Sequence, residues 1–115
     1  MRGQDFSAPV KTVTLGGSTY DLVFSNRAAR IAEDVYADQF GRDVNYLEIL
    51  REMARFKHRA LLAIVYGALI AGGNTMTYEA FEESFTYDSL DFLRDAIKDG
   101  VFGSLPEPED GEQKN

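Results

Sequence analysis

A run of twelve residues from Ala60 to Ala71 is the feature that most constrains how this chain can fold. The run reads Ala-Leu-Leu-Ala-Ile-Val-Tyr-Gly-Ala-Leu-Ile-Ala and contains no charged side chain. A helix that crosses a bilayer needs about 20 apolar residues, so this run is too short to span a membrane. We therefore expect it to form a helix buried in the core of a small domain.

Two short runs near the N-terminus alternate apolar and polar residues, as the strands of a half-buried β-hairpin do. They cover Val10 to Leu15 and Ser18 to Phe24. Gly16 and Gly17 lie between the runs and can adopt the positive φ angles that a tight primed turn requires. The sequence therefore predicts an antiparallel hairpin. Its alternating apolar side chains are Val13, Leu15, Tyr20, Leu22 and Phe24.

An amphipathic helix is predicted directly after the hairpin, from about Asn26 to Gln39. Ser25 can cap its N-terminus, because a serine hydroxyl accepts a hydrogen bond from a free backbone N–H of the first turn. Gly41 is a typical terminator just past the helix end. The apolar residues recur with helical spacing, which predicts one buried face. This face holds Phe24, Ala28, Ile31, Ala32 and Val35.

A second helical region is predicted to open at Asp43 and to end at Gly72-Gly73-Asn74. Either one helix spans Val44 to Ala71, or two helices meet near Lys57 and His58, where the pattern turns polar. We favour two helices, because a helix of roughly thirty residues is unusual in a domain of this size. The apolar side of the first part is expected to hold Val44, Leu47, Leu50, Met53 and Ala54.

Two further helices are predicted towards the C-terminus. A short helix from Tyr78 to Phe85 can be capped by Thr75 or Thr77, and a last helix runs from Asp88 to about Val101. The short helix is expected to turn Tyr78, Phe81 and Phe85 to one side. In the last helix, apolar Leu90, Leu93, Ile97 and Val101 lie opposite Asp88, Asp91, Asp95 and Asp99.

The predicted fold class is α+β, with an N-terminal β-hairpin followed by four or five α-helices. A length of 115 residues suits one domain, which we place at residues 10–103. We expect residues 1–9 to form a flexible N-terminus. Residues 104–115 hold two prolines and four acidic residues, which predicts a disordered acidic C-terminal tail.

Composition argues against several kinds of functional site. The chain has no cysteine, which excludes disulfides, thiolate zinc sites, iron–sulfur clusters and a thiol nucleophile. His58 is the single histidine, and its cationic neighbours and the lack of a nucleophile motif favour a surface or helix-junction residue over a general base. The four aspartates of the last helix are spread along its axis, which favours a solvated face over a metal site. We therefore predict no enzyme activity, no cofactor and no metal.

Arg51, Arg55, Lys57 and Arg59 form a short basic patch, in a chain whose formal net charge is -7. The three arginines recur every four residues, which predicts one helical face. Four cations without interleaved exposed aromatic residues give only weak attraction to nucleic acid, so we expect no nucleic-acid partner. The patch can instead be a solvated face or contact an acidic surface of a partner or a second copy.

Candidate partner-binding residues are therefore the basic patch and those apolar side chains of the central run that the core leaves uncovered. The candidates are Arg51, Arg55, Lys57, Arg59, Leu62, Val65, Tyr66 and Leu69. No secretory signal or membrane segment is recognisable, and we expect a cytoplasmic protein.

The hairpin Val13 to Phe24 runs straight into the helix that begins at Ser25, and an apolar helix, Leu61 to Ala71, and an acidic helix from Asp88 follow. This order resembles the small tail assembly chaperones of long-tailed bacteriophages over about Val10 to Val101. The resemblance implies a phage or prophage protein in the host-cell cytoplasm that binds the tape measure protein before the tail tube polymerises. It also implies self-association into a homo-oligomer and no catalytic residues. The alternative is a small structural or adaptor protein of the virion, such as a tail or head–tail completion component.

Overall fold

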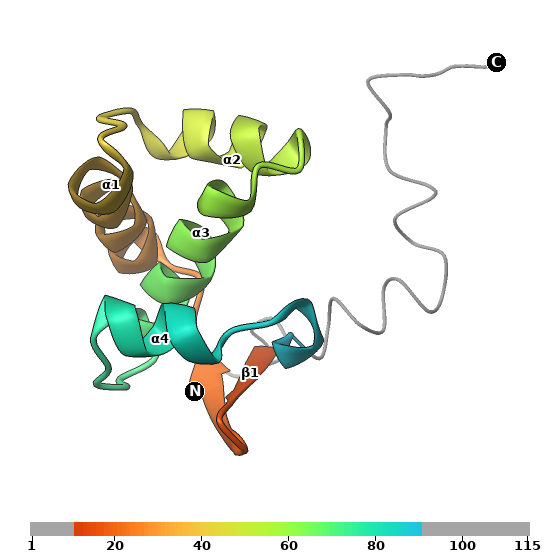
Figure 1. Cartoon of the computed structure of the whole chain (residues 1–115). Helices are drawn as coiled ribbons and strands as arrows, with labels where there is room; N and C mark the ends of the chain where they lie inside the picture. Colours follow the sequence, from red (N-terminus) through yellow and green to blue (C-terminus); the bar gives the residue numbers. More distant parts are fainter. Residues whose placement is uncertain (1–10, 91–115) are drawn as a thin grey trace, which may run out of the picture.

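The computed structural model describes residues 11–90 and shows a two-stranded hairpin followed by four helices, which confirms the predicted α+β class (Figure 1). The strands are β1 (Lys11–Leu15) and β2 (Ser18–Leu22). The helices are α1 (Asn26–Phe40), α2 (Tyr46–Ala54), α3 (His58–Ala71) and α4 (Tyr78–Ser84), and a 3-10 turn, η1 (Tyr87–Ser89), follows them.

The hairpin has the predicted turn and the predicted buried side. Strands β1 and β2 pair antiparallel with Val13 opposite Tyr20, and Gly16 and Gly17 have φ angles of 58° and 88°. Val13 is fully buried. The second strand ends at Leu22, however, two residues before the predicted end at Phe24.

The early end of β2 has a backbone cause. The N–H of Val23 donates to the carbonyl of Ala68 in α3 at 3.0 Å, so the chain leaves the hairpin and is tied to α3. Phe24 is consequently 47% exposed, and the prediction that it continues the buried side of the strand and of α1 is wrong.

Helix α1 begins and ends where its capping residues predict. The Ser25 hydroxyl accepts from the Ala28 N–H at 3.2 Å, and Gly41 adopts a left-handed φ of 68° while its N–H donates to the Ala37 carbonyl at 3.0 Å. The buried face holds Ala28, Ala32 and Tyr36. Tyr36 is fully buried, although it is not among the residues predicted for this face.

The apolar run forms the central helix of the described residues, as predicted. Helix α3 contacts α1, α2, α4 and β2 (Figure 1). It approaches α1 closely at Gly67, where a Cβ atom would lie 2.4 Å from the Ala28 carbonyl oxygen and 3.1 Å from the Ala32 nitrogen. Side chains on almost every side of the helix are buried: Ala60, Leu62, Ala63, Ile64, Val65, Ala68 and Leu69.

Residues 44–71 form two helices, which confirms the favoured alternative. Helix α2 ends at Ala54 and α3 begins at His58, with Phe56 in a left-handed conformation between them. The predicted apolar side of this helix is partly confirmed, because Val44, Leu50 and Met53 pack against the core. Leu47, however, is 64% exposed and Ala54 is exposed, while Ile49 and Glu52 are the buried residues of α2.

Helix α4 follows its prediction closely. The Thr77 hydroxyl accepts from the Ala80 N–H at 3.1 Å, and the aromatic side chains of Tyr78, Phe81 and Phe85 are buried. They extend the core across one side of α3.

The predicted last helix does not begin at Asp88. This residue lies within η1, and Leu90 has an extended backbone that forms an isolated antiparallel bridge with Val13. Leu90 is fully buried, so its side chain packs against the hairpin. The rest of that predicted helix, the predicted tail and the predicted N-terminal segment lie outside the described residues.

The close approach of α1 and α3 can be tested with Gly67→Ala. In an exposed helix interior alanine is about 1 kcal/mol more favourable than glycine, but here its methyl group would overlap the α1 backbone. We expect a net loss of about 1–3 kcal/mol in the free energy of unfolding, measured by urea denaturation. A gain in stability, as helix propensity alone would give, would contradict this packing.

Candidate functional site

The inner side of α2 carries a buried carboxylate. Glu52 is 3% exposed and accepts hydrogen bonds from side chains of three other parts of the fold. The Tyr36 hydroxyl of α1 and the Arg42 guanidinium of the α1–α2 loop donate to it, and Arg59 Nη2 of α3 donates at 3.2 Å. A buried charge is tolerated only when it is paired and hydrogen-bonded, and Glu52 meets both conditions.

The donors around Glu52 also contact one another. Arg59 Nε donates to the Tyr36 hydroxyl at 2.9 Å, and the guanidinium carbon of Arg59 lies 5.9 Å from the centre of the Tyr36 ring. We call Tyr36, Arg42, Glu52 and Arg59 the Glu52 network. It links α1, α2 and α3 through charge-assisted hydrogen bonds, which are stronger than those between neutral groups.

Arg59 is therefore not part of a basic helical face. The four-residue spacing of Arg51, Arg55 and Arg59 predicts one face of one helix, but α2 ends at Ala54 and Arg59 lies in α3. Its guanidinium turns towards Glu52. The predicted alignment of the three arginines is wrong, and Arg59 is a structural residue.

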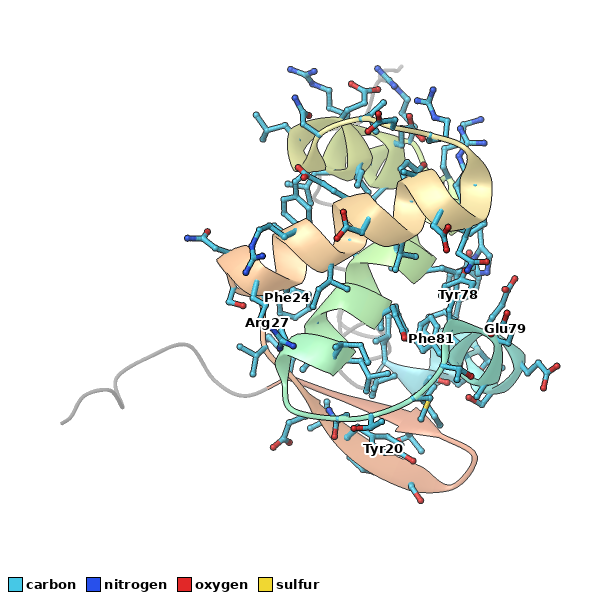
Figure 2. All side chains as sticks on the ribbon, turned by 90° about the vertical axis from the view of Figure 1, so that its left-hand side faces the viewer. Tyr20, Phe24, Arg27, Tyr78, Glu79 and Phe81 are labelled. Carbon is cyan, nitrogen blue, oxygen red and sulfur yellow. The ribbon has the colours of Figure 1, made fainter. Side chains whose placement is uncertain are left out.

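The outer side of α2, together with the residues that directly follow the helix, exposes two large apolar side chains and three cations. Leu47 is 64% and Phe56 70% exposed, and Arg51, Arg55 and Lys57 are exposed as well. Figure 2 shows nitrogen-tipped side chains projecting from the end of the molecule that holds α2. We call these five residues the α2 face.

The cations of the α2 face are only loosely held. Arg51 and Arg55 lie 3.4 and 4.0 Å from the carboxylate oxygens of Glu48. Exposed ion pairs of this kind contribute about 0–1 kcal/mol, so both arginines can exchange this partner for another at little cost.

Phe56 occupies a position that helices usually give to glycine. Its N–H donates to the Met53 carbonyl at 2.9 Å and the Lys57 N–H donates to the Glu52 carbonyl at 3.0 Å, which is the Schellman pattern of a helix end. The φ angle of Phe56 is 64°, a conformation that costs roughly 1–2 kcal/mol for a residue with a Cβ atom. Burial of the ring does not offset this cost, because the ring is exposed.

Most of the apolar partner-binding candidates lie in the core instead. Leu62, Val65 and Leu69 are at most 3% exposed, so the expectation that the core leaves them uncovered is wrong. Tyr66 is partly buried, and its hydroxyl donates to the Met76 carbonyl at 2.6 Å. These side chains of α3 are buried because the helix has neighbouring elements on several sides.

The outer side of α4 is acidic. Glu79, Glu82 and Glu83 of α4 are exposed, and Figure 2 shows Glu79 pointing away from the core. Burial and, in second place, the Glu82 carboxylate raise the pKa of Tyr78. Burial and Glu79 likewise raise the pKa of Tyr66, so the phenols stay neutral and the surface charge comes from the glutamates.

His58 lies at the junction of α2 and α3, as predicted. It is exposed, its Nδ1 atom is 2.9 Å from the Tyr87 hydroxyl, and its ring meets the Tyr87 ring edge-on at 5.3 Å between centroids. The contact ties η1 to the start of α3. Within residues 11–90, no group of three or more histidine, cysteine, aspartate or glutamate side chains is arranged to hold a metal ion.

The comparisons with known proteins identify no relative. No protein-family model, no curated protein and no solved structure matches the chain. In the part of the chain that the structure describes, no helix combines the length and apolar character needed to cross a membrane. The assignment of the α2 face as a candidate partner-binding site therefore depends on its geometry alone.

Two residues of α2, one turn apart, test the Glu52 network. Glu52→Gln removes the buried charge that Arg42 and Arg59 surround, and we expect it to lower the free energy of unfolding by on the order of 3 kcal/mol. The control Glu48→Gln removes a carboxylate with exposed partners and should change stability by less than about 1 kcal/mol. Equal effects of the two variants in urea denaturation would contradict a structural role for the network.

Proposed function

We propose that the protein is a tail assembly chaperone of a long-tailed bacteriophage or prophage. In this role it binds the tape measure protein in the host-cell cytoplasm and catalyses no reaction. The observation that carries the proposal is the α2 face, where Leu47 and Phe56 are exposed beside three cations. Aromatic residues and arginine are enriched where proteins bind one another.

The backbone of Phe56 gives a second reason to regard this face as functional. A residue kept in an unfavourable conformation while its side chain is exposed brings no evident gain to the folded monomer. Such strain concentrates at functional sites. A protein selected for stability alone would have glycine here, whereas a binding protein benefits from a projecting aromatic ring.

The family resemblance points to the class of partner. It rests on a hairpin that runs directly into a helix and on a central apolar helix, and the described residues contain both. The predicted acidic final helix, the third part of the resemblance, falls largely on residues outside them and does not begin at Asp88. The tape measure protein is therefore proposed from the resemblance, and the binding surface from the geometry of α2.

Co-expression with the tape measure protein of the same gene cluster tests the proposal. We expect the two proteins to co-purify and the tape measure protein to become more soluble. Phe56→Gly should strongly reduce co-purification because the exposed ring is lost. It should also raise the free energy of unfolding by about 1 kcal/mol, because glycine relieves the left-handed φ.

A matched control is Val23→Ser, which removes an apolar side chain that is 43% exposed but lies outside the α2 face. It should leave co-purification unchanged. No client capture by the unmodified protein, or equal losses in Phe56→Gly and Val23→Ser, would contradict the proposal. Detection of the protein in purified virions would favour the structural or adaptor alternative, because an assembly chaperone leaves the particle.

A further inference from the structure

We infer that the α2 face of one copy binds the acidic side of α4 in a second copy. The acidic side of α4 is defined by Glu79, Glu82 and Glu83, and we call it the α4 face. The inference goes beyond the proposed function, because it concerns contact between identical chains and needs no client.

The charges of the two faces are complementary. The α2 face presents Arg51, Arg55 and Lys57, and the α4 face presents three exposed glutamates. None of these glutamates forms an ion pair with another side chain within the described residues, where the ion pairs involve Glu48 and Glu52. Opposite charge on two surfaces steers their association and suppresses other orientations.

The spacing of the charges also matches. Arg51 and Arg55 are four residues apart along α2, and Glu79 and Glu83 are four residues apart along α4. Residues with this spacing are neighbours on one side of a helix. Two helices laid side by side can therefore pair both arginines with both glutamates at once.

Apolar surface accompanies the charge on both sides. Leu47 and Phe56 project from the α2 face, while Ala80 is exposed on α4 and Tyr87, which is 53% exposed, follows it in η1. An interface core of apolar side chains within a charged rim is the usual anatomy of a protein–protein contact. The two faces can supply both parts.

Within the described part of one chain, the charges of the two faces do not pair with each other. Arg51 and Arg55 pair with Glu48 of their own helix, and α2 and α4 each pack against α3 rather than closely against each other (Figure 1). The contact therefore has to form between copies. The formal net charge of -7 repels identical chains in most orientations, so association depends on this particular pairing of faces.

Complementary charge reversal tests the contact by sedimentation velocity over a range of protein concentrations. One variant combines Arg51→Glu with Arg55→Glu, and the other combines Glu79→Lys with Glu83→Lys. Each variant alone should self-associate more weakly than the unmodified protein by roughly tenfold or more, because like charges then face each other. An equimolar mixture of the two should associate again, because each reversed face meets an opposite charge.

Exposed charges of α1 provide matched controls, with circular dichroism to verify folding. Arg27→Glu with Arg30→Glu, and Asp34→Lys with Asp38→Lys, change the net charge equally but leave both faces intact, and they should retain self-association. The inference is overturned if the unmodified protein stays monomeric, if the reversals act no more strongly than their controls, or if the mixture fails to associate.

The same experiment separates this inference from the proposed function. If the tape measure protein binds the α2 face, adding it should dissociate the self-associated complexes. This addition of client is the only part of the experiment that rests on the proposed function. Self-association that persists with the client present supports the contact between copies and counts against the proposed client site. If the mixture of the two charge-reversed variants fails to associate, the contact between copies is contradicted, whether or not the client binds.

Discussion

The buried carboxylate of Glu52 is the interaction on which the arrangement of the helices depends. Arg42, Arg59 and the Tyr36 hydroxyl surround it, so the loop after α1, the start of α3 and α1 itself meet at one side chain. A second tie acts nearby, where the Tyr46 N–H at the start of α2 donates to Glu33 of α1 at 2.7 Å. Polar contacts therefore hold α2 in place in addition to the apolar packing of Ile49, Leu50 and Met53.

The orientation of α2 determines what the surface offers. Because Ile49 and Glu52 turn inwards, Leu47 and the arginines of α2 turn outwards. The Schellman end of α2 then projects Phe56 beside them. A structural constraint on the inner side of the helix therefore produces the face that we assign to partner binding.

Local signals in the sequence were enough to predict the hairpin, the caps and the central helix. Gly16, Gly17, Ser25 and Thr77 act through neighbouring backbone groups, and the run ending at Ala71 is apolar enough to be buried in any fold of this size. The inner face of α2 could not be predicted in the same way. The partners of Glu52 lie seven, ten and sixteen residues away, and periodicity assigns a carboxylate to solvent. One feature of the sequence could have indicated the burial of Glu52. It lies on the same side of the helix as the apolar residues Ile49 and Met53.

The same limitation explains the errors at the candidate site. Arg59 was assigned to the basic patch because it follows Arg55 by four residues, although the favoured break near Lys57 and His58 separates the two. Its partner Glu52 lies in the other helix. The predicted helix start at Asp88 was wrong because Leu90 bridges to Val13, which is distant in sequence. Arg51, Arg55 and Lys57 were identified correctly as exposed cations, since their environment depends on short-range structure.

Hydrogen exchange of the α2 amides is the most direct test of the claim that the Glu52 network holds α2 in place. The informative variant is Arg59→Met, which keeps most of the aliphatic side chain and removes the guanidinium that contacts Glu52 and Tyr36. We predict faster exchange confined to α2, with the amides of α1 and of the middle of α3 still protected. Unchanged protection of α2, or an equal loss of protection in all three helices, would contradict the account.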